Sequence, residues 1–172
     1  METRTAELAE ANRHLSEREV ELKQVAFHDA LTELPNRRYL IERVEMALSD
    51  ARRRGESIAL LLIDLDHFKP INDGHGHDAG DLLLRTLSQR LRDLVRSSDM
   101  AARLGGDEFA VLLTGPNVEQ DAAQIAERLL HELSQPVPYR DVTLAVTISV
   151  GAAFFPRHAD GFSQLYKAAD EA

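Results

Sequence analysis

Two acidic stretches, each bordered by apolar residues, hold the side chains best suited to chemistry. LLLIDLD places Asp64 and Asp66 where an apolar run ends, and ARLGGDEFAVLL places Asp107 and Glu108 directly after two glycines. Alternate residues of a strand share one face, so Asp64 and Asp66 point the same way at the lip of a sheet. If the glycine turn belongs to a hairpin that pairs with this strand, Asp107 lies close to Asp64.

Carboxylates in that position favour a divalent cation. Like charges repel, and both acids stay ionised most easily when a cation lies between them. Asp64, Asp107 and the Leu65 carbonyl are hard oxygen donors that suit Mg²⁺ or Mn²⁺, with substrate phosphates as further ligands. Gly105 and Gly106 permit the positive φ values of a tight turn and leave room for a phosphate chain. The alternative is a plain hairpin turn with solvated acids, which is the commoner meaning of an isolated GGDE.

Periodicity predicts the elements that must position these acids. Continuous or alternating apolar residues predict strands within 57–66, 100–113 and 139–156. Apolar residues at helical spacing predict helices after the break at Pro35 and Asn36, and over 80–99, 118–136 and 162–172. Residues 67–81 are expected to form a loop or a short helix. The pattern therefore predicts an α+β domain in which helices pack on a sheet.

Residues 1–26 differ from the rest of the chain and predict a separate N-terminal signalling helix or coiled-coil linker. They are rich in Glu, Arg and Ala and contain neither Gly nor Pro. A rough heptad seam is formed by Leu8, Ala11, Leu15, Arg18, Leu22 and Val25. A solvated helix with one apolar stripe is the alternative.

Composition narrows the classes of function. The 172 residues carry a formal net charge of −9, which argues against a nucleic-acid partner and requires a cation before a polyphosphate can approach. The absence of cysteine excludes disulfides, thiolate zinc sites and cysteine nucleophiles. No apolar run approaches the ~20 residues of a membrane span. We expect a cytoplasmic location, and a membrane anchor elsewhere in a longer protein stays open.

Several blocks together resemble the GGDEF family, the diguanylate cyclases. They are DALTELPNRR, DLDHFKPINDGHGHDAGD, RSSDMAARLGGDEFAVLL, TISVGAAFFP and LYKAADEA, in the order and spacing of that family. The resemblance runs over residues 27–172 and implies a nucleotidyl-cyclase or palm-like (ferredoxin-like) fold with a mostly antiparallel sheet flanked by helices. Family members continue with a helix whose lysine and arginine contact GTP phosphates, so the final helix is expected to be truncated here. Glu33 stands where the family commonly has glycine.

The resemblance also implies an activity. Two GTP molecules, one on each subunit of a homodimer, condense with Mg²⁺ into cyclic di-GMP, a bacterial second messenger, and release pyrophosphate. It assigns the metal to Asp64, the Leu65 carbonyl and Asp107, and catalysis to Asp107, Glu108 and Lys69. Substrate contacts are implied for Phe68, Lys69, Asn72, His77, Asp81, Gly105 and Gly106. Asn72 and Asp81 would read guanine, because an amide and a carboxylate match donors and acceptors that adenine lacks.

RSSD, with Arg96 and Asp99, resembles the family's product-inhibition site for cyclic di-GMP. Arginine can stack on guanine while aspartate accepts from its donors, although such a pair alone is commonly surface charge. The resemblance further implies an upstream sensor domain and leaves open a downstream phosphodiesterase domain. Two alternatives stay open: a catalytically weak regulatory module that binds GTP or cyclic di-GMP, and another nucleotidyl cyclase or polymerase palm.

Overall fold

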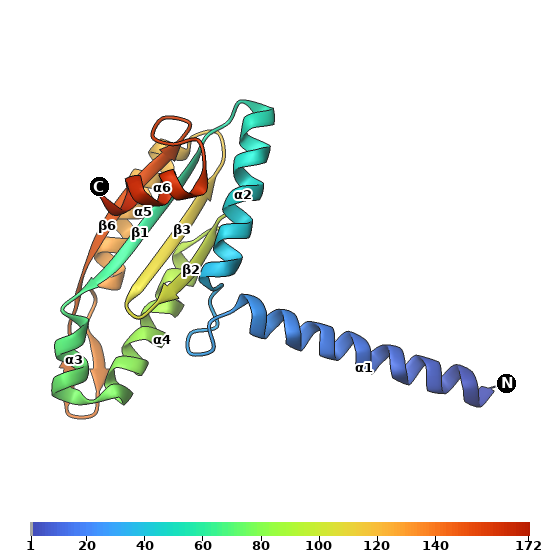
Figure 1. Ribbon diagram of the computed structural model, residues 1–172. Helices are drawn as coiled ribbons and strands as arrows, with labels where there is room; N and C mark the ends of the chain where they lie inside the picture. Colours follow the sequence, from blue (N-terminus) through green and yellow to red (C-terminus); the bar gives the residue numbers. More distant parts are fainter. Residues whose placement is uncertain (1) are drawn as a thin grey trace.

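The computed structural model describes residues 2–172, and its centre is one antiparallel sheet (Figure 1). Four strands form it in the order β2-β3-β1-β6. Their bounds are β1 Ile58–Asp66, β2 Met100–Gly105, β3 Glu108–Thr114 and β6 Thr147–Phe155. β1 pairs with β3 on one side and with β6 on the other, so both of its edges are satisfied. The continuous apolar run of β1 thus predicted its central place.

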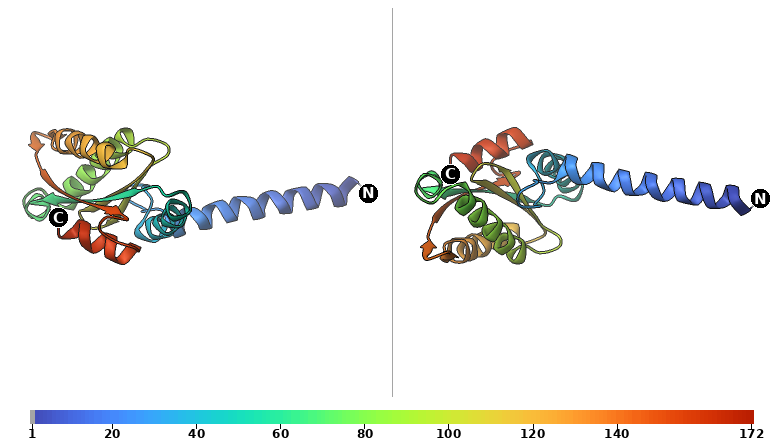
Figure 2. Two further views of the ribbon diagram at one scale, coloured as in Figure 1. Left: turned by 90° about the horizontal axis from the view of Figure 1, so that it is seen from above. Right: turned by 90° about the horizontal axis from the view of Figure 1, so that it is seen from below.

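Helices cover both faces of this sheet. One face carries α4 (His77–Leu94) and α5 (Val118–Leu133), and the other carries α2 (Arg37–Arg54) and α6 (Phe162–Asp170). The views from above and below show these two layers with the sheet between them (Figure 2). Alternate residues of β1 serve the two layers, Ala59 and Leu61 facing α4 and α5 while Ile58 and Leu60 face α2 and α6. The expected α+β sheet flanked by helices is confirmed.

Two segments were incompletely predicted. Residues 67–81 form the short helix α3 (Phe68–His75) and the first turn of α4, which begins at His77 and not at residue 80. A small hairpin of β4 (Val137–Tyr139) and β5 (Val142–Leu144) follows α5, and its first strand was missed. Pro138 lies inside β4, and proline within a short run argues against a strand unless the strand is an edge.

The N-terminal segment is one long helix, α1 (Glu2–Phe27), which extends away from the rest of the molecule (Figure 1). Its apolar side chains are exposed: Leu8, Leu15, Leu22 and Val25 keep 63%, 66%, 70% and 81% of their surface. The helix is confirmed, and the seam predicted from the heptad pattern is left uncovered within one chain. Among residues 2–172 no helix combines the length and the apolar character needed to cross a membrane.

The junction between α1 and α2 is built around Asn36. Its Oδ1 accepts from the Tyr39 amide and caps α2, while its Nδ2 donates to the Ala26 carbonyl near the end of α1. The backbone amide of Asn36 also donates to the Phe27 carbonyl. The break predicted at Pro35 and Asn36 therefore ties the end of α1 to the start of α2 rather than forming a loose linker.

Candidate active site

The end of β1 and the glycine turn form one structure. Asp64 lies opposite Glu108 in the register of β1 and β3, and the Leu65 amide donates to the Asp107 carbonyl at 3.2 Å. Gly105 and Gly106 have φ values of 136° and 51°, and a Cβ added to either would meet nothing within 4 Å. The turn therefore needs glycine for its conformation and leaves open space beside the acids. The predicted approach of Asp107 to Asp64 is observed.

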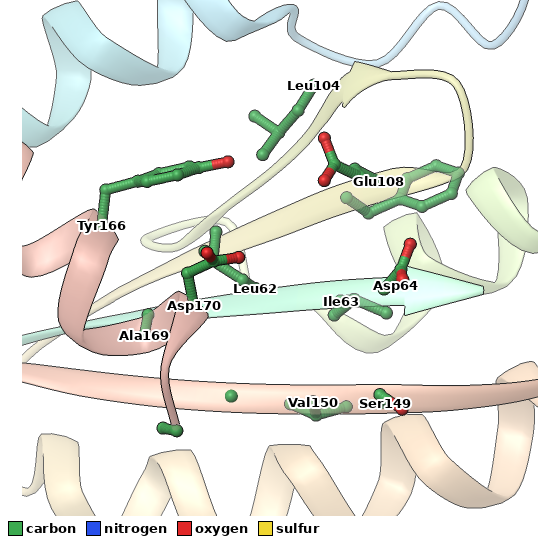
Figure 3. A pocket seen from close by; sticks show the side chains of 13 residues that line it. Leu62, Ile63, Asp64, Leu104, Glu108, Ser149, Val150, Tyr166, Ala169 and Asp170 are labelled. Atoms are coloured by element: carbon green, nitrogen blue, oxygen red, sulfur yellow. The ribbon is translucent and has the colours of Figure 1, made fainter. Parts of the chain in front are cut away.

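Asp64 and Glu108 also share one face of the sheet. Directly opposed residues of an antiparallel pair project to the same side, and both line a pocket of about 270 Å³ with Ser149, Tyr166 and Asp170 (Figure 3). Asp107 does not line this pocket. Sequence reasoning paired Asp64 with Asp107 as ligands, and the cross-strand register adds Glu108 as an equally placed carboxylate.

Asp64 has a raised proton affinity at this end of the sheet. Burial raises the pKa of Asp64 above its ordinary value, and the negative charges of Asp107 and Asp66 raise it further. A cation at this position would remove that repulsion. Across residues 2–172 no three His, Cys, Asp or Glu side chains converge as a metal-holding cluster. Two carboxylates with one backbone carbonyl still fit Mg²⁺, which takes much of its coordination from water and phosphate.

Asp66, which shares a face with Asp64, holds two strands together. It accepts hydrogen bonds from the Thr147 hydroxyl at 2.8 Å and the Ser149 hydroxyl at 2.9 Å. These two bonds hold the pKa of Asp66 below its ordinary value. The residue therefore fastens the end of β1 to β6, immediately before the chain turns into α3.

The side chains expected to hold the nucleotide lie on α3 and α4. Phe68 and Lys69 begin α3, and Asn72 lies in its second turn, half-buried. His77 is exposed at the start of α4, and Asp81 follows one turn later, half-buried. The Asn72 amide group lies against α4 at Gly80, the residue before Asp81. The structure thus places Asn72 against the residue that precedes Asp81, while the roles of these five residues stay predictions.

Arg96 and Asp99 lie beyond α4, at the end of β2 opposite to the glycine turn. Asp99 accepts from the Thr114 amide at 3.1 Å, and burial raises its pKa above the ordinary value. Arg96 is exposed and donates to Asp121 at 3.1 Å. The two residues are close together as predicted, but the arginine already has a counter-ion on α5.

An arginine network that sequence reasoning missed supports the glycine turn. Arg103 Nη1 contacts both carboxylate oxygens of Asp29, at 2.9 Å and 3.0 Å. Its Nε and Nη2 donate to the Gly106 carbonyl at 3.1 Å and 2.7 Å. Asp29 also accepts from the Thr32 amide and hydroxyl. Burial alone would raise the pKa of Asp29, but these hydrogen bonds outweigh burial and hold it below its ordinary value.

The antiparallel sheet with helices on both faces and a glycine turn beside paired acids matches the α+β fold expected from the family resemblance. The family model described as "Diguanylate cyclase, GGDEF domain" matches residues 26–172. The chain therefore belongs to the GGDEF domain family.

Two curated relatives support the assignment to this family. The chain is 41% identical over 167 residues to diguanylate cyclase TpbB of Pseudomonas aeruginosa, covering 96% of this chain and 38% of that protein. It is 42% identical over 172 residues to the bifunctional diguanylate cyclase/cyclic di-GMP phosphodiesterase MucR of the same species, covering 100% of this chain and 24% of MucR. The chain thus spans well under half the length of either relative.

Among solved structures, the coiled coil and GGDEF domain of DgcB from Caulobacter crescentus, in complex with c-di-GMP, matches with a TM-score of 0.89 and 28% identity. That match covers 99% of this chain and 91% of the DgcB chain, and therefore includes α1. A variant of TpbB that comprises only the GGDEF domain matches with a TM-score of 0.80 and 44% identity, covering 83% and 84%.

Proposed function

We propose that this chain is the catalytic domain of a diguanylate cyclase, which condenses two GTP into cyclic di-GMP with release of pyrophosphate. The observation that carries the proposal is the junction of β1 and the glycine turn, where Asp64 faces Glu108 and the Asp107 carbonyl is bonded to the Leu65 amide. Phosphoryl transfer depends mainly on positioning and on electrostatic stabilisation. This junction offers acids for a metal and open backbone for phosphates.

Each residue of the site has a proposed part. Asp64, the Leu65 carbonyl and a turn acid hold Mg²⁺ or Mn²⁺, which when bound neutralises phosphate charge and polarises the attacked phosphorus. Lys69 and the backbone of Phe68 bind phosphate oxygens, and Gly105 and Gly106 let the triphosphate approach the main chain. Guanine is read by Asn72 and Asp81, with His77 beside the ribose. The turn acids Asp107 and Glu108 are the carboxylates available to accept the proton of the attacking 3′-hydroxyl.

The test is incubation of the chain with GTP and Mg²⁺, followed by separation of the nucleotides and calorimetric titration. We expect cyclic di-GMP and pyrophosphate from GTP and neither the cyclic dinucleotide of adenine nor turnover from ATP. Equal handling of ATP and GTP would instead indicate another nucleotidyl cyclase. A chain that binds neither nucleotide would overturn the proposal.

A regulatory module is the second candidate. The chain is also 40% identical over 146 residues to cyclic di-GMP phosphodiesterase NbdA, a protein named for the opposite activity. A domain of this family can thus occur beside other catalytic domains. Tight GTP binding without product would favour the regulatory module.

The reaction needs two loaded chains that face each other, and α1 is the proposed dimerisation element. Leu15→Glu places a charge in the exposed heptad seam, so we expect a monomer and a drop of about tenfold or more in product formation with GTP binding retained. Val20→Glu is the matched control, because Val20 is 65% exposed, like Leu15 at 66%, but lies off the seam. Sedimentation and turnover measure both variants. Equal effects of the two variants on dimerisation and turnover would contradict the role of the heptad seam in dimerisation.

Cyclic di-GMP is the proposed inhibitor at Arg96 and Asp99. We expect Asp121 to weaken the binding of cyclic di-GMP there. The Arg96–Asp121 ion pair must open before the arginine can bind the product. An exposed ion pair is worth up to about 1 kcal/mol, so Asp121→Asn should lower the inhibition constant by up to about fivefold. Glu119→Gln removes a charge from the same turn of α5 but pairs with Arg157 instead, and it should change little. An unchanged or higher constant in Asp121→Asn would refute the competition.

A further inference from the structure

Gly80 occupies an unexpected position for a glycine. It is the fourth residue of α4 and is buried, with no positive φ that would require glycine. Glycine inside a helix lowers helix stability relative to alanine. A glycine kept there without a conformational need points to close packing.

Asn72 is the neighbour that requires position 80 to have no side chain. A Cβ built on Gly80 would lie 1.9 Å from Asn72 Oδ1 and 2.9 Å from its Cγ. It would also lie 3.2 Å from Cζ of Phe68. All three distances are shorter than normal van der Waals contacts of a Cβ atom. Exchanging the oxygen and nitrogen of the amide would leave the overlap in place. The Asn72 amide therefore lies directly on the bare backbone of α4.

We propose that Gly80 is a specificity-determining positioning residue for the purine base. It lets the Asn72 amide reach the surface of α4 immediately beside Asp81, so that an amide and a carboxylate face one base together. This inference rests on the proposed function, since it assumes that Asn72 and Asp81 read guanine. Gly80 itself touches no substrate and acts through Asn72.

A methyl group at position 80 is expected to weaken recognition of the base rather than to destabilise the fold. The clashing atoms are the end of the Asn72 side chain, which can rotate away, while alanine favours the helix. Once rotated, the amide no longer lies beside Asp81. A site built to hydrogen-bond a base loses discrimination steeply when one partner is displaced.

The experiment compares Gly80→Ala with Gly74→Ala. Gly74 lies in α3, and a Cβ there would meet nothing within 4 Å, so its replacement makes the same chemical change without a clash. KM and kcat are measured for GTP and for ITP, which lacks the 2-amino group of guanine. We expect Gly80→Ala to raise KM for GTP by about tenfold or more and to bring the GTP and ITP values together, with kcat within a few-fold of wild type. Gly74→Ala should behave as wild type.

A double variant separates positioning from general damage. Asn72→Ala removes the clashing atoms, so adding Gly80→Ala to it should cause no further loss of GTP affinity, and thermal unfolding should show that both Gly80 variants fold. A Gly80→Ala chain with normal KM and normal discrimination, or losses that add in the double variant, would overturn the role of Gly80 alone. Equal use of GTP and ATP by the wild type would overturn the proposed function and this role with it.

Discussion

Replacing Asp64 by asparagine is expected to lower cyclic di-GMP formation by about a thousandfold while the fold survives. The substitution keeps the shape of the side chain but removes the charge proposed to hold a cation against the phosphates. Asp64 is exposed at the end of β1 and its carboxylate has no packing role comparable to that of Leu65. Turnover of GTP, measured with and without excess Mg²⁺, gives the result.

Asp64→Asn should not lower the stability of the fold, although it lowers activity. Burial and the charges of Asp107 and Asp66 raise the pKa of Asp64 above 3.8. Ionising it in the folded chain is therefore unfavourable, and the fold loses stability as pH rises through the window between 3.8 and the raised value. The asparagine variant lacks this cost at neutral pH, so its unfolding midpoint should be equal or slightly higher. An asparagine variant that keeps wild-type turnover would contradict the metal role, and one that unfolds more easily would contradict the electrostatic cost of ionising Asp64.

Two companion variants decide which turn acid shares the cation. If Glu108 is the second ligand, as its position opposite Asp64 suggests, Glu108→Gln should raise the Mg²⁺ concentration for half-maximal activity more than Asp107→Asn does. The reverse order would assign the ligand to Asp107, as the spacing of the sequence predicts. Asp141→Asn, in the exposed turn between β4 and β5, serves as the control for loss of one charge.

Local patterns predicted most of the fold because they record burial directly. The apolar run 57–66 could only be a strand covered on both faces, and β1 has α4 and α5 on one side and α2 and α6 on the other. The glycine pair predicted the tight turn, since its φ values are costly for other residues. Helix bounds were less certain where α4 starts at Gly76–His77 without a side-chain cap.

Contacts between distant residues could not be predicted in this way. Whether Asp107 or Glu108 faces Asp64 depends on the register of two strands 44 positions apart, which a one-residue shift would reverse. The spacing predicted that Asp66 shares a face with Asp64, but not its bonds to Thr147 and Ser149. The bond from Arg103 to Asp29 likewise joins residues 74 positions apart. These side chains meet only through tertiary contacts, which a local sequence pattern does not record.

Replacing Arg103 by methionine is expected to lower both stability and activity. The guanidinium is only 10% exposed and Asp29 21% exposed, and methionine leaves that carboxylate and the Gly106 carbonyl without their shared donor. Loss of one member of a largely buried pair costs about 2–4 kcal/mol. Because the same side chain holds the turn, product formation should fall further than the folded fraction does. Chemical denaturation and turnover per folded chain measure the two losses, with the exposed Arg43→Met as control.

The pH dependence of unfolding identifies the source of the loss. In the wild type the pKa of Asp29 lies below its ordinary 3.8, so its contribution is present above pH 3.8 and is lost as pH falls through the lowered value. Arg103→Met removes part of the cause, so its deficit against the wild type should shrink towards pH 3. A deficit that stays constant from pH 7 to pH 3 would indicate lost packing rather than a lost ion pair.

A double variant separates the two jobs of the arginine. In Asp29→Asn with Arg103→Met the buried charge is gone, so part of the stability should return relative to Arg103→Met. Activity should stay low, because the Gly106 carbonyl still lacks its two donor contacts and the turn beside Asp107 is unsupported. Recovery of activity together with stability would mean that the turn needs no support from Arg103. Recovery of stability alone would show that the Arg103 side chain supports the glycine turn separately from its pairing with Asp29.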